Sequence, residues 1–225
     1  MAYRDRYHLE PLRVTAHFRT NPVCDQWLPL DGILLYQANR EALGPELAAL
    51  PGGVDTQGVG TLPLAIIHPG RRNWCYACSW AQPQPWWVAE EIRHWNKRFD
   101  TQYSDMVDFG DRRGKVIIEQ GRYKAYHMPM FTRAALQAEW YCVGDKAEIE
   151  RLLSLVTHIG KKRSQGFGRV WRWDVELWTE DWSIWRDGHL TRGVSDEDAG
   201  KALDRIFYGI RPPYYRKENQ TWLAV

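Results

Sequence analysis

The stretch that decides the fold is VGDKAEIERLLSLVTHIGKKRSQGFGRVW, which runs from Val143 to Trp171. Asp145 and Glu148 stand three residues apart just before an apolar run, which is the spacing of a helix N-cap and an acidic residue in the first turn. The apolar residues then recur at helical spacing, at Ile149, Leu152, Leu153 and Val156. This pattern predicts a helix that begins at Asp145, and it predicts Gly160 as the residue just past the helix end.

A glycine-rich basic loop, Gly160 to Arg169, joins that helix to the next predicted strand. Its glycines allow tight turns and close approach of the backbone to a ligand. Exposed N–H groups, four cations and no acidic residue together favour phosphate binding. The spacing is not that of a P-loop or of a dinucleotide fingerprint, and the alternative is a solvated turn whose glycines serve geometry alone. The candidate phosphate ligands are Gly160, Lys161, Lys162, Arg163, Ser164, Gln165, Gly166, Gly168 and Arg169.

The N-terminal part of the chain contains a clear strand pattern. Residues 12–19 alternate between apolar and polar side chains, which predicts a half-buried strand. The polar face of this strand is basic, so it offers further candidate ligands for an anionic partner. Those candidates are Arg13, His17 and Arg19.

One more helix and two more strands complete the predicted core, and the first of these strands is expected over residues 138–143. Asp31 can cap a helix that runs to about Leu43. Residues 169–178 predict a strand that returns after the glycine-rich loop. Its large apolar side chains are expected on one face, and they are Trp171, Trp173, Val175 and Leu177.

The middle of the chain is basic and rich in turns. Residues 62–67 and 73–80 are typical of short strands joined by a Pro-Gly turn, and residues 88–99 have a weakly helical pattern. A hairpin is predicted over residues 115–126, around Gln120-Gly121, so this section is expected to form a protruding arm. The cations of the arm are candidate ligands for a polyanion: Arg112, Arg113, Lys115, Arg122 and Lys124.

The order of these elements indicates the fold class. Strand, helix, hairpin, arm, strand, helix, glycine-rich loop and strand form the split βαβ pattern of an α+β fold, a ferredoxin-like or RRM-like domain with an inserted basic β-hairpin arm. The alternative is a generic α+β enzyme domain. We expect a single domain over residues 1–225, with residues 100–135 as the inserted arm and residues 179–225 as a C-terminal extension that contains a helix over 196–207.

Composition narrows the class of protein. The chain has 225 residues, which is enough to bury a core without disulfides. Its formal net charge of +2 excludes a uniformly basic nucleic-acid binder but not one with a local basic patch. No run approaches the roughly 18 apolar residues of a membrane span. The N-terminus has no apolar signal region, so a cytoplasmic protein is expected.

The cysteines are expected to be free thiols in such a compartment. Cys75 and Cys78 form a C-x-x-C, but no second pair and no paired histidines follow at zinc spacing. A strand through this segment would place the two sulfurs on opposite faces. Buried thiols are therefore favoured over a metal site, and neither a metal nor a cofactor is expected.

The loop also carries a family resemblance. The run IGKKRSQGFGRV, after the helix that starts VGDKAEIERLL, resembles the glycine-rich loop of the RAMP superfamily of CRISPR-associated proteins. Two more motifs, LPLDGILLY at 28–36 and RPPYY at 211–215, are similar to those of the type IV CRISPR subunit that caps the 5′ handle of the guide RNA. The order and spacing of the motifs extend the resemblance over most of the chain.

This resemblance implies an RRM-like, non-catalytic subunit that caps the 5′ handle of crRNA in a multi-subunit effector complex used against foreign nucleic acid. The arm would correspond to a thumb that reaches towards the guide and the neighbouring backbone subunit. The partners would be crRNA, the backbone and large subunits, and target DNA indirectly through the guide, with no membrane. The RNA-contacting positions carried over from the loop motif are Gly160, Lys161, Lys162, Arg163, Ser164, Gly166 and Gly168.

Catalysis has one candidate among the seven histidines. His17 lies on the polar face of the first predicted strand, and an imidazole there can move the proton of a ribose 2′-hydroxyl. Because spacing fixes no second acid–base residue, we expect His17 to contact phosphate or water without catalysing. The alternative is a metal-independent endoribonuclease that processes precursor crRNA. A third hypothesis is a small-molecule enzyme whose loop binds a phosphorylated substrate.

Overall fold

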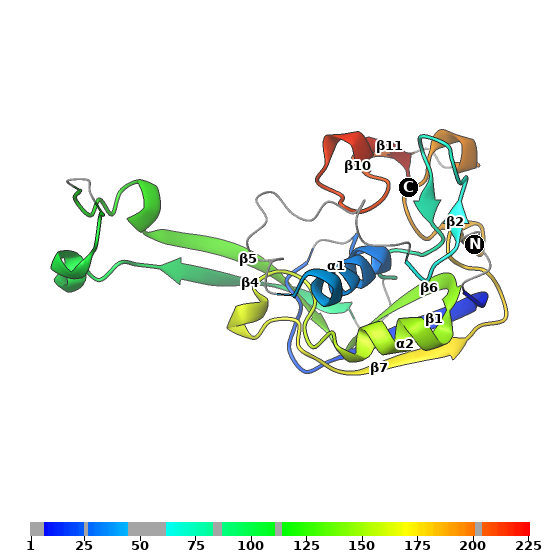
Figure 1. Ribbon diagram of the computed structural model, residues 1–225, viewed down its shortest axis with the longest axis horizontal. Helices are drawn as coiled ribbons and strands as arrows, with labels where there is room; N and C mark the ends of the chain where they lie inside the picture. Colours follow the sequence, from blue (N-terminus) through cyan, green and yellow to red (C-terminus); the bar gives the residue numbers. More distant parts are fainter. Residues whose placement is uncertain (1–6, 25–26, 45–61, 83–86, 111–113, 201–203) are drawn as a thin grey trace.

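The computed structural model describes residues 7–24, 27–44, 62–82, 87–110, 114–200 and 204–225. It is a mixed α+β structure, as predicted, in which strands predominate. At its centre is an antiparallel sheet in the order β6-β1-β7, formed by β1 Leu9–Phe18, β6 Gln137–Asp145 and β7 Val170–Leu177. One face of this sheet is covered by helices α1 Leu30–Leu43 and α2 Lys146–Ser154 (Figure 1). The described residues contain no helix long and apolar enough to cross a membrane.

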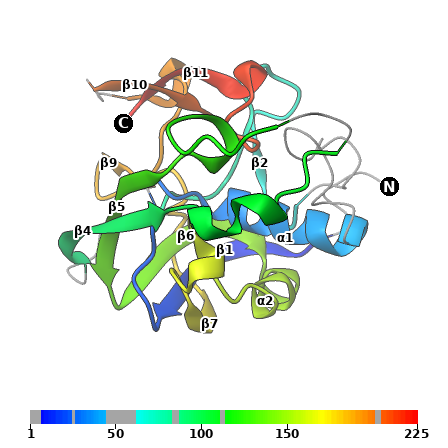
Figure 2. The ribbon, with the colours of Figure 1, turned by 90° about the vertical axis from the view of Figure 1, so that its left-hand side faces the viewer.

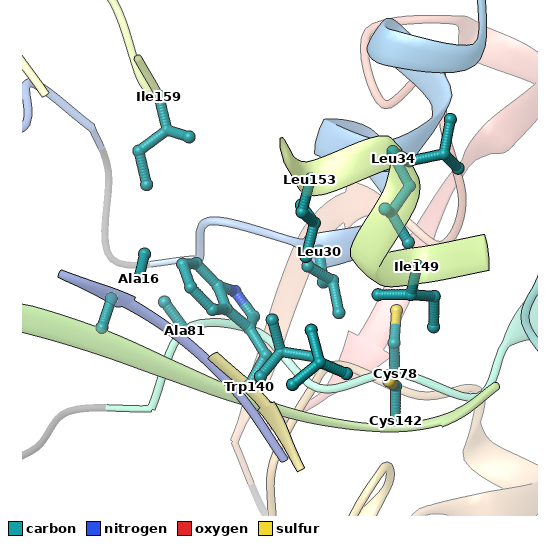
Figure 3. Packing of buried hydrophobic residues seen from close by; sticks show 14 of the residues in the cluster. Ala16, Leu30, Leu34, Cys78, Ala81, Trp140, Cys142, Ile149, Leu153 and Ile159 are labelled. Atoms are coloured by element: carbon teal, nitrogen blue, oxygen red, sulfur yellow. The ribbon is translucent and has the colours of Figure 1, made fainter. Parts of the chain in front are cut away.

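The main core lies between the two helices and the sheet (Figure 3). The alternation predicted for the first strand is confirmed, because the apolar positions of β1 are buried. Val14 stands opposite Trp140 of β6 and Val175 of β7, so these three side chains share the covered face of the sheet. The fully buried Trp140 donates its indole N–H to the carbonyl of Leu28 at 2.9 Å, which satisfies its polar atom.

The two helices differ in how well the sequence predicted their ends. Helix α2 is capped as predicted, because the Asp145 carboxylate accepts the Glu148 N–H at 3.0 Å. This helix ends well before Gly160, so the prediction of Gly160 as the residue after the helix is wrong. Helix α1 begins after Pro29, and Asp31 is a buried residue of its first turn and not its N-cap. Burial explains the difference, because the Asp31 carboxylate is used by a buried ion pair instead of the helix end.

Residues 62–82 lie along the edge of β6. Both strands predicted here are shorter than expected, and they are β2 Ile66–Ile67 and β3 Cys75–Tyr76. Isolated bridges join Cys78 to Cys142 and Gln82 to Glu139. The segment therefore extends the central sheet beyond β6 without forming a continuous strand.

A long two-stranded ribbon projects from the body in Figure 1 and points towards the viewer in Figure 2. It consists of β4 Trp87–Lys97 and β5 Tyr126–Ala135, which pair antiparallel. The helix predicted over 88–99 is therefore wrong, and so is the hairpin over 115–126, where the chain forms bends and the short 3-10 turn η4 Gly121–Tyr123. A second 3-10 turn, η3 Thr101–Met106, follows β4. The strand-forming residues of β4 find their partner far along the chain, which a local pattern does not reveal.

The C-terminal extension packs against the segment 62–82. Its regular elements are β8 Trp185–Arg186, β9 His189–Leu190, η6 Asp196–Asp198, β10 Arg205–Gly209, η7 Lys217–Asn219 and β11 Gln220–Ala224. Ile206 of β10 pairs with Leu223 of β11, and both side chains join an apolar cluster with Cys75 and Trp80. The helix predicted over 196–207 is wrong, because β10 is held as a strand by this pairing.

A buried cation ties the extension to the body. The side chain of Arg192 is 1% exposed. Its Nη1 donates to the carbonyl of Tyr76 at 2.6 Å and to that of Cys78 at 2.9 Å, and its Nη2 donates to the carbonyl of Ile210 at 2.6 Å. One guanidinium therefore links the segment beside β6 to the end of β10.

The counter-charge of this cation is Asp31, at the start of α1. Arg192 Nη1 lies 3.9 Å from Asp31 Oδ2, and the Tyr214 hydroxyl donates to Asp31 Oδ1 at 2.5 Å. Burial raises the pKa of Asp31 above its ordinary value of 3.8, and the positive charge of Arg192 opposes that rise. The LPLDGILLY and RPPYY motifs therefore meet in space, because Asp31 belongs to the first and Tyr214 to the second.

Replacing Arg192 with Met should lower the free energy of unfolding by about 3–5 kcal/mol at neutral pH, because a buried carboxylate loses its counter-charge. Without Arg192 the folded-state pKa of Asp31 rises further above 3.8, so the folded protein keeps a proton that the unfolded chain releases. The free energy of unfolding of this variant should therefore fall as pH rises above that value. Urea unfolding at several pH values measures the effect.

The matched control for this prediction is the double variant Arg192→Met/Asp31→Asn. It has no titrating carboxylate at position 31, so the extra pH dependence should disappear. An Arg192→Met variant that is destabilised equally at every pH would contradict the proposed role of the buried ion pair.

Candidate nucleic-acid interface

The glycine-rich loop is anchored to the chain that follows β1. The Lys161 N–H donates to the carbonyl of Val23 at 2.7 Å. Gly160 has φ +81°, and a Cβ at this position would lie 2.6 Å from the Val23 carbonyl oxygen. Gly168 has φ +63°, and a Cβ there would lie 2.0 Å from the carbonyl oxygen of Ile159. These two glycines are therefore required for close contacts within the protein itself.

Thr20 closes the other end of the loop. Its hydroxyl donates to the carbonyl of Gly166 at 2.6 Å and accepts the N–H of Arg169 at 2.9 Å. The N–H groups of Gln165, Gly166 and Gly168 also donate to carbonyls of this chain. At these positions the backbone N–H groups are used in hydrogen bonds within the protein. The capacity of the loop to bind phosphate therefore resides largely in its side chains.

The cations of the loop lie against aromatic rings of two other elements. After Lys162, which has φ +57°, the chain forms the 3-10 turn η5 Arg163–Gln165. The Lys162 Nζ lies 3.5 Å from the centre of the Trp95 ring, on β4 of the arm. The Arg163 guanidinium lies 4.4 Å from the centre of the Tyr36 ring, on α1. These cation–π contacts hold the two charges on either side of the loop. No local sequence pattern pointed to Trp95, whereas Tyr36 ends the LPLDGILLY motif.

Two hollows flank the loop. The first has a volume of about 630 Å³ and lies between α1 and the chain after α2, where its lining includes Tyr36, Arg40, His158, Arg163 and Ser164. The second has a volume of about 330 Å³ and is lined by Arg19, Thr20, Asn21, Arg93, Gln165, Gly166 and Phe167. The structure therefore brings several predicted ligands of the loop together with Arg19, which directly follows β1, around η5. It adds Arg40 and Arg93, which the sequence analysis missed because they belong to a helix and a strand far from the loop in sequence.

Arg13 and His17 lie apart from these two hollows, on the outer face of the sheet, where acidic neighbours pair with them. Arg13 forms an ion pair with Glu176 of β7 at 2.5 Å, and the hydrogen bond that it donates to this carboxylate raises the pKa of Arg13. His17 Nε2 lies 2.7 Å from Asp174 Oδ2, which also accepts a hydrogen bond from Arg172 at 2.8 Å. The polar face of β1 is therefore balanced in charge at these positions.

A bulge in β7 overturns part of the prediction for this strand. The pairing of β1 with β7 shifts register between His17 and Phe18. As a result Trp171 is 52% exposed beside His17, with ring centres 5.7 Å apart, and does not share the buried face with Trp173 and Val175. Trp171 therefore adds an exposed aromatic ring to the outer face of the sheet.

The described cations that were predicted for the arm come after η3 and before β5, in the part of the chain that joins the two strands of the ribbon. Lys115 and Arg122 line a hollow of about 750 Å³ together with Phe109 and Tyr123. The Lys124 Nζ lies 5.6 Å from the centre of the Tyr126 ring. Two further predicted ligands, Arg112 and Arg113, lie outside the described residues. The Tyr126 ring in turn stacks on that of Trp95, with ring centres 6.2 Å apart, so two aromatic rings lie between Lys124 of the arm and Lys162 of the loop.

The four cysteines are buried and form no disulfide. Cys75 and Cys78 belong to different apolar clusters, in agreement with the prediction that their sulfurs lie on opposite faces. Burial raises the pKa of Cys75, Cys78 and Cys142, so these thiols are held in the protonated form. Within the described part of the chain, no group of three His, Cys, Asp or Glu side chains is arranged to hold a metal ion.

These features define an α+β protein whose basic, glycine-rich loop stands where a helix, the central sheet and a long arm meet. The family model described as CRISPR type IV associated protein Csf3 matches residues 10–225, and the chain belongs to this family. It is therefore a type IV CRISPR-associated subunit, and the type IV resemblance of its motifs is confirmed. Among the curated proteins, none matches the chain significantly.

Proposed function

We propose that this protein is a non-catalytic guide-RNA-binding subunit that caps the 5′ handle of crRNA in a type IV effector complex. The single observation that carries the proposal is the loop around η5, where Lys161, Lys162 and Arg163 stand together between the arm and α1. A cluster of cations on a protein with a net charge of only +2 is suited to one local polyanion. Because the chain belongs to a type IV CRISPR family, we propose RNA as this polyanion.

We further propose that the body is a ferredoxin-like domain of the RAMP type, one domain into which the arm is inserted and to which residues 179–225 are appended. The order β7-β1-β6, continued by the bridged segment 62–82, supports this view. Helix α1 follows β1, and α2 lies between β6 and β7, as the split βαβ pattern requires. In such a domain the loop after α2 stands at one end of the sheet, where a strand of RNA can cross it.

The arm is proposed to act as a thumb towards the guide and a neighbouring backbone subunit. Its cations would position the RNA backbone without reading bases. The cross-strand pair Ile92 and Phe131 is 56% and 58% exposed, so the ribbon also offers apolar surface to a protein partner. The large subunit would complete the complex, target DNA would be reached indirectly through the guide, and the complex would work in the cytoplasm.

The alternative function is metal-independent processing of precursor crRNA, and the contact of His17 with Asp174 at 2.7 Å is the observation in its favour. A carboxylate can orient an imidazole that moves a proton. The same carboxylate is shared with Arg172, however, and the site lies on an outer face balanced in charge. These contacts favour a structural or RNA-contacting role for His17.

Replacing Lys161, Lys162 and Arg163 with Ala should weaken the binding of single-stranded handle RNA and flatten its salt dependence. Each phosphate contact that is lost should remove roughly 0.7 from the slope of log K against log salt. Fluorescence anisotropy over a series of salt concentrations measures both quantities. The matched control is Lys146→Ala/Arg205→Ala/Lys217→Ala, which removes the same charge from the α2 and C-terminal surfaces. Identical slopes for the loop variant and the wild type would exclude the loop as the RNA site.

Replacing residues 98–125 with Asn-Gly should spare the body and the affinity for a short handle but reduce assembly with the backbone subunit. Lys97 and Tyr126 face each other in the last pair of the ribbon, so a two-residue turn can join them. Co-purification with guide RNA and the backbone subunit measures assembly. A Lys115→Ala/Arg122→Ala/Lys124→Ala variant separates the effect of charge from that of length. Assembly of the shortened protein at wild-type yield would refute the thumb role.

The wild-type protein should leave repeat RNA uncut in EDTA, and His17→Ala should leave handle RNA bound and intact. The physical reason is that the carboxylate beside His17 also serves Arg172. Gel analysis of labelled repeat RNA measures both results. Metal-free cleavage by the wild type that His17→Ala abolishes would establish the endoribonuclease instead.

A further inference from the structure

The larger hollow beside the loop has the size and chemistry of a nucleotide site. Its volume is about 630 Å³, within the range of small-ligand pockets. It opens between the C-terminal half of α1 and residues 155–164, and its described lining includes neither Lys162 nor Trp95. The lining residues used below are Tyr36, Arg40, Leu155, Thr157, His158 and Arg163.

The charge of this hollow is positive. Arg40 and Arg163 line it, and none of the described residues in its lining carries a carboxylate. The acidic neighbour on α1, Glu41, is turned to α2, where Arg151 donates to its two oxygens at 3.0 and 2.9 Å. These hydrogen bonds lower the pKa of Glu41, and its negative charge is paired with the positive charge of Arg151. The two guanidiniums of the hollow therefore keep their charge for an anionic ligand.

The hollow also offers surfaces for an aromatic ring. Tyr36 is 40% exposed, and Leu155, from the end of α2, is 47% exposed. Arg163 lies over the Tyr36 ring at 4.4 Å, which shows that a flat group fits against this ring. His158 Nδ1 is 3.0 Å from the Thr157 hydroxyl, so donors and acceptors for the edge of a base lie close by. Phosphate ligands, a stacking ring and hydrogen-bonding groups are the three requirements of an unstacked nucleotide.

We propose that this hollow binds one nucleotide of a single-stranded RNA, with its base against Tyr36 and Leu155 and its phosphate on Arg40 and Arg163. The inference rests on the proposed function and deepens it, because Arg163 belongs both to the glycine-rich loop and to the hollow. An RNA strand that follows the loop meets Arg19 and Arg93 in the smaller hollow at one end and this site at the other. The nucleotide at the larger hollow therefore leaves the stack of its neighbours.

The test is a scan of handle RNA in which 2-aminopurine replaces one base at a time. With the wild-type protein, one position should show a fluorescence change on binding that its neighbours do not show. Tyr36→Leu should abolish that change and weaken RNA binding by roughly five- to hundredfold, the range of a lost base stack. Tyr36→Phe should retain both. Arg40→Ala should lower the salt slope by roughly 0.7, the loss of one phosphate contact.

Two controls separate the inference from the proposed function. Tyr215→Leu removes a tyrosine that is 58% exposed elsewhere on the surface, and it should bind RNA as the wild type does. Adenosine monophosphate and uridine monophosphate are added alone to test whether the site takes a free nucleotide.

Each outcome decides one claim. Wild-type protein that binds no RNA would refute the proposed function. Wild-type binding with no position-specific signal, or with the same signal and affinity in Tyr36→Leu, would overturn this inference and leave the proposed function standing. Tyr36-dependent binding of a free mononucleotide, without any such effect on RNA, would also overturn it. Circular dichroism of Tyr36→Leu checks the fold, and retention of binding by Tyr36→Phe distinguishes stacking from a structural role.

Discussion

A buried guanidinium sets the relative positions of the parts from which this protein is built. Arg192 exchanges water for three backbone carbonyls and the carboxylate of Asp31, and these partners come from separate stretches of the chain. A buried cation without such partners would destabilise the folded protein by several kcal/mol. The segment beside β6, the end of β10 and the start of α1 must therefore keep their positions relative to one another. The same constraint orients α1, which carries Tyr36 and Arg40 to the glycine-rich loop.

The loop in turn depends on two kinds of contact. Gly160 and Gly168 allow its backbone to lie against Val23 and Ile159, where a side chain would collide. Aromatic rings then hold its cations, because Lys162 packs on Trp95 of the arm and Arg163 on Tyr36 of the body. A polyanion that contacts this loop is therefore in reach of both the arm and a helix. The glycines shape the loop, whereas the binding chemistry comes from side chains that the fold assembles around it.

Several parts of the structure were determined by signals complete within a few residues of sequence. The strand β1 follows from its alternation, and the start of α2 follows from Asp145 and Glu148, because burial of one face and capping of a helix are local requirements. The position of the basic loop and its resemblance to CRISPR-associated proteins also lie within one short run, and the type IV family match agrees with it. The α+β class followed from the order of these elements.

Other parts were decided only by the tertiary structure. Residues 88–97 and 205–207, which were predicted to be helical, form strands because β5 and β11 supply partners, and a helical period in sequence does not reveal a partner far along the chain. Asp31 became the counter-charge of Arg192 instead of a helix cap, and the bulge beside Phe18 turned Trp171 outwards. Arg40, Arg93 and Tyr36 joined the candidate site for the same reason. These residues lie close to the loop in space because burial and strand pairing over the whole chain bring them there. The sequence by itself shows only how far apart they are along the chain.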